Sequence, residues 1–186
     1  MEKIIVNTKQ QLREIIRISD NHADLNHLDV SRITNMAQLF LGSKFNGNIS
    51  KWDVSNVRNM KHMFESSQFQ GDISQWDVSQ VTDMSFMFYN SKFNGVISKW
   101  NTKNVISMRA MFAMSVFDGD VNEWDVSKVT DMSSLFNVHK FQVDVSNWLV
   151  NDNVDMSMMF NHCNIRPKLS ESIIRVAAIR HLGLDR

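Results

Sequence analysis

The stretch FQGDISQWDVSQVTDMSFMF, residues 69–88, decides the architecture of this chain because it is repeated. The preceding stretch FNGNISKWDVSNVRNMKHMF, residues 45–64, has the same pattern. Tryptophan recurs at positions 52, 76, 100, 124 and 148, an unbroken spacing of 24. Self-similarity at a fixed period of this length is the signature of a repeat architecture. The sequence therefore predicts six consecutive units of this length between Leu28 and Glu171.

Large apolar residues occupy the same positions in successive units and form columns through the alignment. The phenylalanine column consists of Phe40, Phe64, Phe88, Phe112, Phe136 and Phe160, and the first methionine column of Met36, Met60, Met84, Met108, Met132 and Met156. One coil cannot hide its own apolar face, but stacked coils let each side chain pack on its counterparts above and below. Methionine fills irregular gaps and contacts aromatic rings favourably, so columns of methionine beside columns of phenylalanine and tryptophan are expected in the core, which accounts for the high methionine content.

Within a unit, the spacing of Ile49, Trp52 and Val54 matches the strand signature of leucine-rich repeats. Residues 82–88 begin with possible helix-capping residues and place Met84, Met87 and Phe88 on one helical face. Gly47 and its equivalents are expected to adopt a positive φ and turn the chain back. The predicted fold is an α/β repeat solenoid, leucine-rich-repeat-like, with six coils of short parallel strands and short helices.

Both ends of the array carry segments suited to cover the exposed core. Residues 1–27 are predicted to be an N-terminal cap, with a short strand at residues 4–6 and a helix at residues 9–18 capped by Thr8. Residues 28–169 form the predicted array, and residues 170–186 a C-terminal capping helix that begins at Ser170. The apolar stripes expected on these helices are Leu12, Ile15, Ile16 and Ile18 in the first and Ile173, Ile174, Ala177, Ala178 and Leu182 in the second.

Composition excludes several classes of partner. Lys plus Arg and Asp plus Glu both number 20, so no overall field would recruit nucleic acid or an anionic membrane. The single cysteine, Cys163, cannot form an internal disulfide and is compatible with a reducing compartment. The sequence shows neither a signal-peptide pattern nor an apolar run long enough to span a bilayer. These features predict a cytoplasmic protein that does not bind membranes.

The two quoted stretches resemble the BspA-like leucine-rich repeats, including the repeat family abundant in mycoplasma surface proteins. The resemblance covers about three-quarters of the chain, and the segment TKQQLREII at residues 8–16 resembles the way such arrays begin. It implies a solenoid used for binding, often on a cell surface, without catalytic residues. The absence of a visible signal or anchor departs from that context.

One candidate binding surface is the face formed by the residues that alternate with the predicted strand positions. Its proposed partner-binding residues are Lys51, Asp53, Asp77, Lys99, Lys103, Glu123 and Asp125. The stacked aspartates have two interpretations: local hydrogen bonds to turn backbone and nearby serines, or a polar recognition strip or cation site along Asp53 and Asp77.

A second candidate surface is apolar and belongs to the third and fourth units. Its proposed residues are Phe86, Tyr89, Ile106, Ala110, Ala113, Met114 and Val116. Clustered exposed aromatic and methionine side chains often mark an interface. The alternative is that some of them pack sideways against neighbouring coils. If exposed, this surface could bind a foreign protein or a second copy of the chain.

No catalytic or cofactor-binding motif is present. A metal site at His139, His162 and Cys163 is a minor alternative, because His139 and Cys163 are one period apart. The sequence therefore predicts a non-enzymatic protein-binding module without a cofactor. Two variants stay open: an inhibitor encoded by a phage or other mobile element, acting in the host cytoplasm, and a surface adhesin whose export signal is missing.

Overall fold

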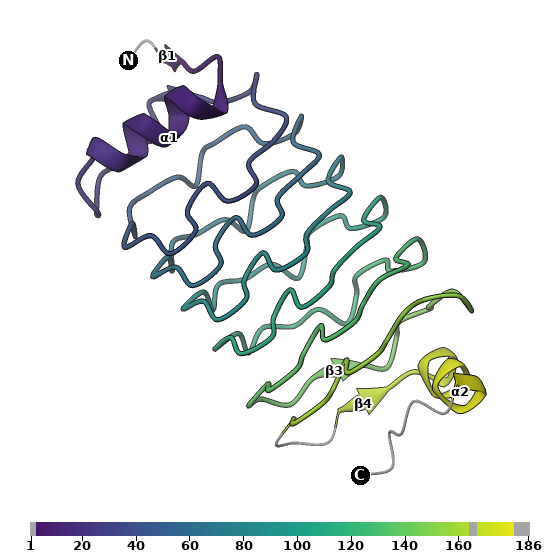
Figure 1. The fold of residues 1–186 in the computed structure, drawn as a ribbon. Coiled ribbons are helices and arrows are strands. Elements are labelled where there is room, and N and C mark those ends of the chain that lie inside the picture. The colour runs from purple at the N-terminus through teal and green to yellow at the C-terminus, as the bar shows by residue number, and fades with distance from the viewer. Residues whose placement is uncertain (1–2, 164–166, 181–186) are drawn as a thin grey trace.

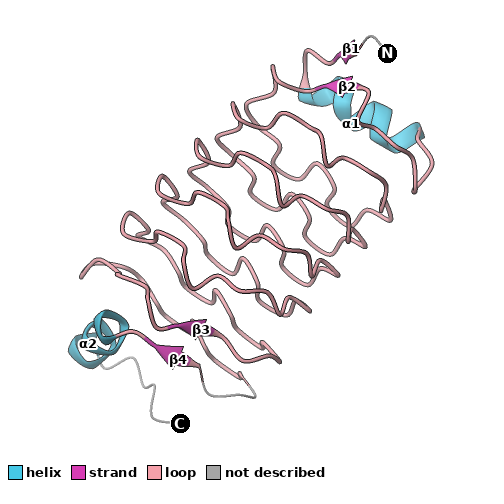
Figure 2. Cartoon of the chain, turned by 180° about the vertical axis from the view of Figure 1, so that it is seen from behind, coloured by secondary structure: helices cyan, strands magenta, loops and turns pink. Residues whose placement is uncertain are grey.

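A computed structural model describes residues 3–163 and 167–180 of the chain. Helix α1, Lys9–Ile18, lies at the N-terminal end, and helix α2, Glu171–Arg180, lies at the opposite end. Between them the backbone winds through successive turns that lie side by side (Figure 1). Most of this winding consists of loops and turns (Figure 2).

Pairing between neighbouring turns has a constant register of one repeat. Strand β1, Ile4–Ile5, pairs in parallel with β2, Leu28–Asp29, and β3, Asp144–Val145, pairs in parallel with β4, Lys168–Leu169. Isolated parallel bridges join further residues one repeat apart, namely Asp24 with Asn48, and Asn35, Asn59, Asp83, Ser107, Asp131 and Asp155 in succession. Equivalent residues of successive units are therefore neighbours in space.

The aromatic columns form the centre of the core. All five tryptophans are buried, and the rings of Trp52 and Trp76 stack with centroids 6.5 Å apart and an interplanar angle of 2°. Consecutive rings from Phe40 to Phe160 stack with centroids 5.2 to 5.8 Å apart. Each indole N–H donates to a carbonyl 27 residues earlier, so its burial leaves no unpaired donor.

The strand expected at Ile49–Val54 is absent, which corrects that prediction. The N–H of Trp52 donates to the carbonyl of Ile49 over 3.1 Å, closing a turn. In the next unit, Asp72 and Asp77 accept the backbone N–H groups of Ser74 and Ser79, each over 2.9 Å. These local bonds use N–H groups that a strand would pair with its neighbour, so the segment turns repeatedly.

The helical turns expected at residues 82–88 are also wrong. Phe86 has a φ of 59°, in the left-handed region, which no right-handed helix contains. The N–H groups of Met84, Phe86 and Phe88 donate to carbonyls of the following unit over 2.8 to 3.0 Å. Met84, Met87 and Phe88 are nevertheless fully buried. The apolar pattern identified core residues correctly, while the backbone bonds run between coils.

The role of the repeated glycines differs from the prediction. Among the described residues, only Gly42 is a glycine with positive φ, at 63°. Gly71 is required for space, because a Cβ atom there would lie 2.7 Å from the ring of Phe69. The glycine column makes room for the phenylalanine ring two residues earlier.

Helix α1 begins where the sequence places it. The Thr8 hydroxyl accepts the N–H of Gln11, and the Gln11 side chain accepts the N–H of Thr8, both over 3.1 Å. Leu12 and Ile16 are buried, and Ile15 packs partly buried against the core. Ile18, which was included in the apolar stripe, is exposed.

Helix α2 uses a different stripe from the one predicted. Ile173, Val176 and Ala177 are buried, whereas Ile174 and Ala178 are exposed, which corrects their assignment. The helix therefore rests on the core through residues 173, 176 and 177. Leu182 lies outside the described residues.

Candidate functional site

All seven residues proposed for the first candidate surface are exposed. The carboxylate of Asp53 accepts the N–H of Ser55 over 3.1 Å and its hydroxyl over 2.6 Å. Asp125 forms the same pair of bonds with Ser127, over 3.0 and 2.7 Å. Local turn formation thus accounts for these aspartates, in agreement with the first interpretation of them.

Serine hydrogen bonds also favour the charged form of Asp77 and Asp125. Hydrogen bonds from the side chain and backbone of Ser79 lower the pKa of Asp77, and nearby Lys103 lowers it further. Ser127 lowers the pKa of Asp125 in the same way, with help from Lys128. Asp77 and Asp125 therefore carry a negative charge at neutral pH, on a surface that also presents the side chains of Lys51, Lys99 and Lys103.

The structure divides the second candidate surface into exposed and buried members. Ile106 and Met114 are 49% and 47% exposed, and Phe86, Tyr89 and Val116 are half-buried. Ala110 and Ala113 are buried, which contradicts their placement on the surface. A methyl group does not reach past longer neighbouring side chains. We refer below to Phe86, Tyr89, Ile106, Met114 and Val116 as the apolar patch.

Contacts within and between coils hold three residues of the apolar patch in place. The ring of Phe86 stacks on the imidazole of His62, with centroids 4.7 Å apart, and meets the ring of Tyr89 edge-on at 5.8 Å. The hydroxyl of Tyr89 donates to the sulfur of Met114 over 3.1 Å. Sideways packing and surface exposure, the two alternatives for this region, therefore occur together.

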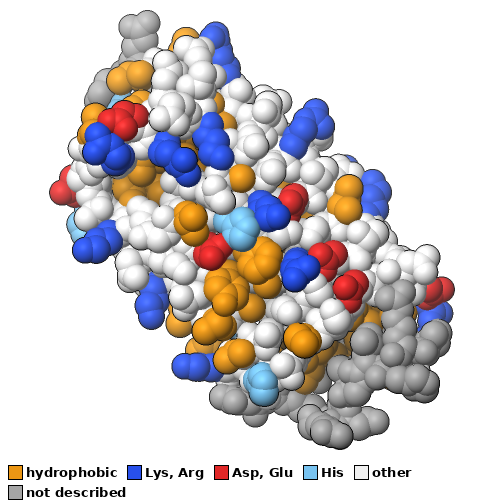
Figure 3. All heavy atoms as spheres, viewed as in Figure 1, with side chains coloured by type: hydrophobic (Ala, Val, Ile, Leu, Met, Phe, Trp, Pro, Cys, Tyr) orange, Lys and Arg blue, Asp and Glu red, His pale blue; other side chains and the backbone are white. Residues whose placement is uncertain are grey.

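Arg109 borders the apolar patch, and two lysines lie in coils next to it. The guanidinium of Arg109 lies 6.0 Å from the centre of the Phe86 ring. Lys61 and Lys92 precede Ser85 and Val116 by one repeat, so they lie in neighbouring coils. In the part of the chain that the structure describes, none of these three cations has an ion pair. Figure 3 shows hydrophobic side chains gathered across the central turns of one face, with both basic and acidic side chains beside them.

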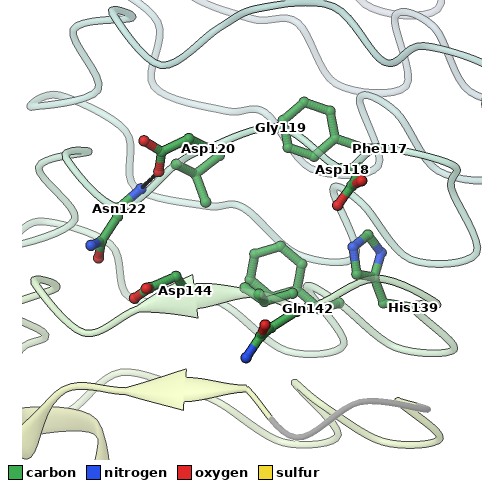
Figure 4. A pocket seen from close by; sticks show the side chains of 11 residues that line it. Phe117, Asp118, Gly119, Asp120, Asn122, His139, Gln142 and Asp144 are labelled. Carbon is green, nitrogen blue, oxygen red and sulfur yellow. Dashed lines mark hydrogen bonds between the residues drawn. The ribbon is translucent and has the colours of Figure 1, made fainter.

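A cavity of about 310 Å³ lies between the fourth and fifth units, in a place that sequence reasoning missed (Figure 4). Its lining consists of Phe117, Asp118, Gly119, Asp120, Val121, Asn122, Phe136, His139, Gln142, Val143 and Asp144. The sequence did contain a signal for this cavity, because two columns of the repeat change residue type in the fifth unit. Val143 replaces the glycine of earlier units, and His139 replaces serine.

The three residues of the minor metal alternative do not form a metal site. His139 is buried, His162 is exposed, and the Cys163 thiol donates to the carbonyl of Phe136 over 3.1 Å. Burial lowers the pKa of His139 and raises the pKa of Cys163. Residues 3–163 and 167–180 contain no group of three or more His, Cys, Asp or Glu placed to hold a metal ion.

Neither helix in the described part of the chain has the length and apolar character that crossing a bilayer requires.

Comparisons with known proteins return one family. No curated protein and no solved structure matches the chain. The model of a family described as "Mycoplasma protein of unknown function, DUF285" matches residues 9–116 and again residues 66–171. The two matches overlap and together extend from α1 to the start of α2. The chain therefore belongs to this mycoplasma-type repeat family.

Proposed function

We propose that this chain is a non-enzymatic binding module, built as a BspA-like, leucine-rich-repeat-like solenoid, which binds another protein through the apolar patch. The observation that carries the proposal is the arrangement of that patch. Phe86, Tyr89 and Met114 are held by contacts between coils and remain partly accessible. Rigid aromatic and methionine side chains at a surface are typical of interface centres.

The border of the patch defines the chemistry of the partner. Arg109, Lys61 and Lys92 lack ion pairs among the described residues, so they are available to acidic groups. The matching partner presents an apolar centre flanked by Asp or Glu. Complementary charges at a rim raise the association rate and make it sensitive to salt.

Affinity capture from a host lysate tests this assignment. The bait is compared with Phe86→Ser, Met114→Ser and, as a control on the other candidate surface, Lys99→Ser. Loss of one protein from both patch variants, with retention by Lys99→Ser, is the expected result. The circular dichroism of all variants should match that of the parent protein. Retention of every captured protein by the patch variants would refute the assignment.

Two further measurements refine the proposal. Arg109→Glu should slow association with the captured partner and reduce its salt dependence, because the border then loses a cation. Gel filtration distinguishes a foreign partner from a second copy of the chain, since self-association through the apolar patch would double the mass and disappear in Phe86→Ser. A cytoplasmic site of action is part of the proposal, and cell fractionation tests it.

A further inference from the structure

The cavity in the fifth unit exists because one phenylalanine has left its column. Phe69, Phe93 and Phe117 are buried, and each stacks on the phenylalanine five residues earlier with centroids 4.3 to 4.6 Å apart. Phe141, the equivalent residue of the fifth unit, is only partly buried and meets His139 edge-on at 6.0 Å. The inner position that the other rings fill is therefore vacated in this unit.

Two sequence changes explain the displacement. A Cβ atom at Gly119 would lie 2.5 Å from the ring of Phe117 two residues earlier. Val143 carries a branched side chain at the same position of the next unit, so the ring of Phe141 cannot adopt the inner conformation. His139 takes the place of the small buried serines, among them Ser115, and contacts Phe136 edge-on.

The cavity combines an aromatic wall with an acidic rim. Phe117, Phe136 and Val143 supply apolar surface, and Asp118, Asp120 and Asp144 supply carboxylates. No Lys or Arg is among the described residues that line it. Lys168, which does not line the cavity, forms an ion pair with Asp144, with 3.0 Å between its Nζ atom and the carboxylate Oδ2 atom. Asp118 and Asp120 have no ion pair within the described ranges.

His139 adds an incompletely satisfied polar group to this lining. Its side chain is 2% exposed, and its Nδ1 atom has no hydrogen-bond partner in the part of the chain that the structure describes. Figure 4 shows the imidazole beside the cavity, with the carboxylate of Asp118 turned toward it. A buried imidazole nitrogen without a hydrogen-bond partner lowers the stability of the folded state. Burial also lowers the pKa of His139, which keeps the ring neutral.

We propose that this cavity binds an organic cation: an ammonium or guanidinium group on an apolar or aromatic stem. The stem lies against Phe117 and Phe136, and the positive group meets Asp118 and Asp120. Aromatic faces and carboxylates both attract a cation, while the same carboxylates repel an anion. The cation belongs either to a free amine or to a basic side chain of a protein. This site is separate from the apolar patch and goes beyond the function proposed above.

Calorimetric titration with defined probes tests the site. The free-amine probe is 2-phenylethylammonium, with neutral 2-phenylethanol and anionic 3-phenylpropanoate as matched controls. The side-chain probe is an arginine-containing tripeptide with both termini capped. Binding of either cation, with the neutral and anionic controls at least about fivefold weaker, is expected, since each nearby carboxylate contributes roughly that factor. The stronger of the two cations identifies the source, and failure of both overturns the proposal.

Substitutions in the cavity test whether the cation binds there. Asp118→Asn and Asp120→Asn should each weaken cation binding about fivefold, whereas Asp77→Asn removes the same charge elsewhere and should have no effect. The double variant His139→Ser with Val143→Gly restores the residues of the other units, lets Phe141 fill the cavity and should abolish binding. Unchanged binding by a folded double variant would overturn the assignment. The patch variant Phe86→Ser should bind the cation normally, so the two proposals fail independently.

Discussion

The second to fourth units and the fifth unit share the same repeat length but differ in how a phenylalanine ring packs in their core. In the earlier units a glycine leaves room for a phenylalanine ring, as Gly71 does for Phe69. In the fifth unit Val143 occupies the glycine position, Phe141 is only partly buried, and a cavity opens beside His139. The period of the repeat therefore does not guarantee equivalent packing. A valine in place of glycine in this column moves the phenylalanine ring two residues earlier out of the core.

The largest expected effect compares the same residue type in the two regions. Phe93→Ala should cost about 3–5 kcal/mol in the free energy of unfolding, because the ring is fully buried and stacked. Phe141→Ala should cost much less, since its ring is only partly buried. Urea denaturation of both variants measures the difference. Equal losses would show that Phe141 supports the core as its equivalents do.

A second substitution should convert a regular unit into a copy of the fifth. Gly71→Val should destabilise the protein by about 1–3 kcal/mol, because the new side chain collides with the ring of Phe69. A crystal structure of this variant should show Phe69 displaced and a new cavity beside it. If Phe69 keeps its position, the explanation given for the displacement of Phe141 is incorrect.

The two regions also differ in residues with positive φ. Val138 has a φ of 57°, which is strained for a β-branched residue, whereas Asn90 holds the equivalent position of the third unit at 50°. Val138→Asn should stabilise the protein by about 1 kcal/mol, and Asn90→Val should destabilise it by a similar amount. Thermal denaturation checks both. Opposite signs would contradict the backbone assignment of this column.

The smallest expected effect is a pH dependence confined to the fifth unit. Burial lowers the pKa of His139 below its ordinary value of 6.5. Protonation then favours the unfolded chain, so stability should be full above pH 6.5 and fall as the pH drops through that value toward the lowered pKa.

His139→Ser should remove that part of the pH profile, because the equivalent residue of the fourth unit is Ser115. The exposed His22, replaced by serine, is the control for removing an imidazole. Chemical denaturation between pH 5 and pH 8 tests the pair. An identical slope in parent and His139→Ser proteins would exclude this origin.

The sequence predicted core residues more reliably than backbone conformation. Met84, Met87 and Phe88 were assigned to one apolar face, and all three are buried. The helix assigned to them does not form, because side-chain periodicity reports which residues face the core and not where their N–H groups donate. The candidate site shows a similar division. The pattern placed Phe86 and Met114 at the surface, where both are at least partly exposed, but it could not show that Ala110 and Ala113 are buried.

The sequence alone determined the spacing of the repeat, the identity of the aromatic and methionine columns, and the Thr8 cap of α1. These depend on residue type and local spacing, which the sequence states directly. Only the tertiary structure decided that the backbone bonds run between coils through residues of positive φ. Only the structure, too, revealed the cavity beside His139, because that cavity depends on whether one ring and one side chain can occupy the same space.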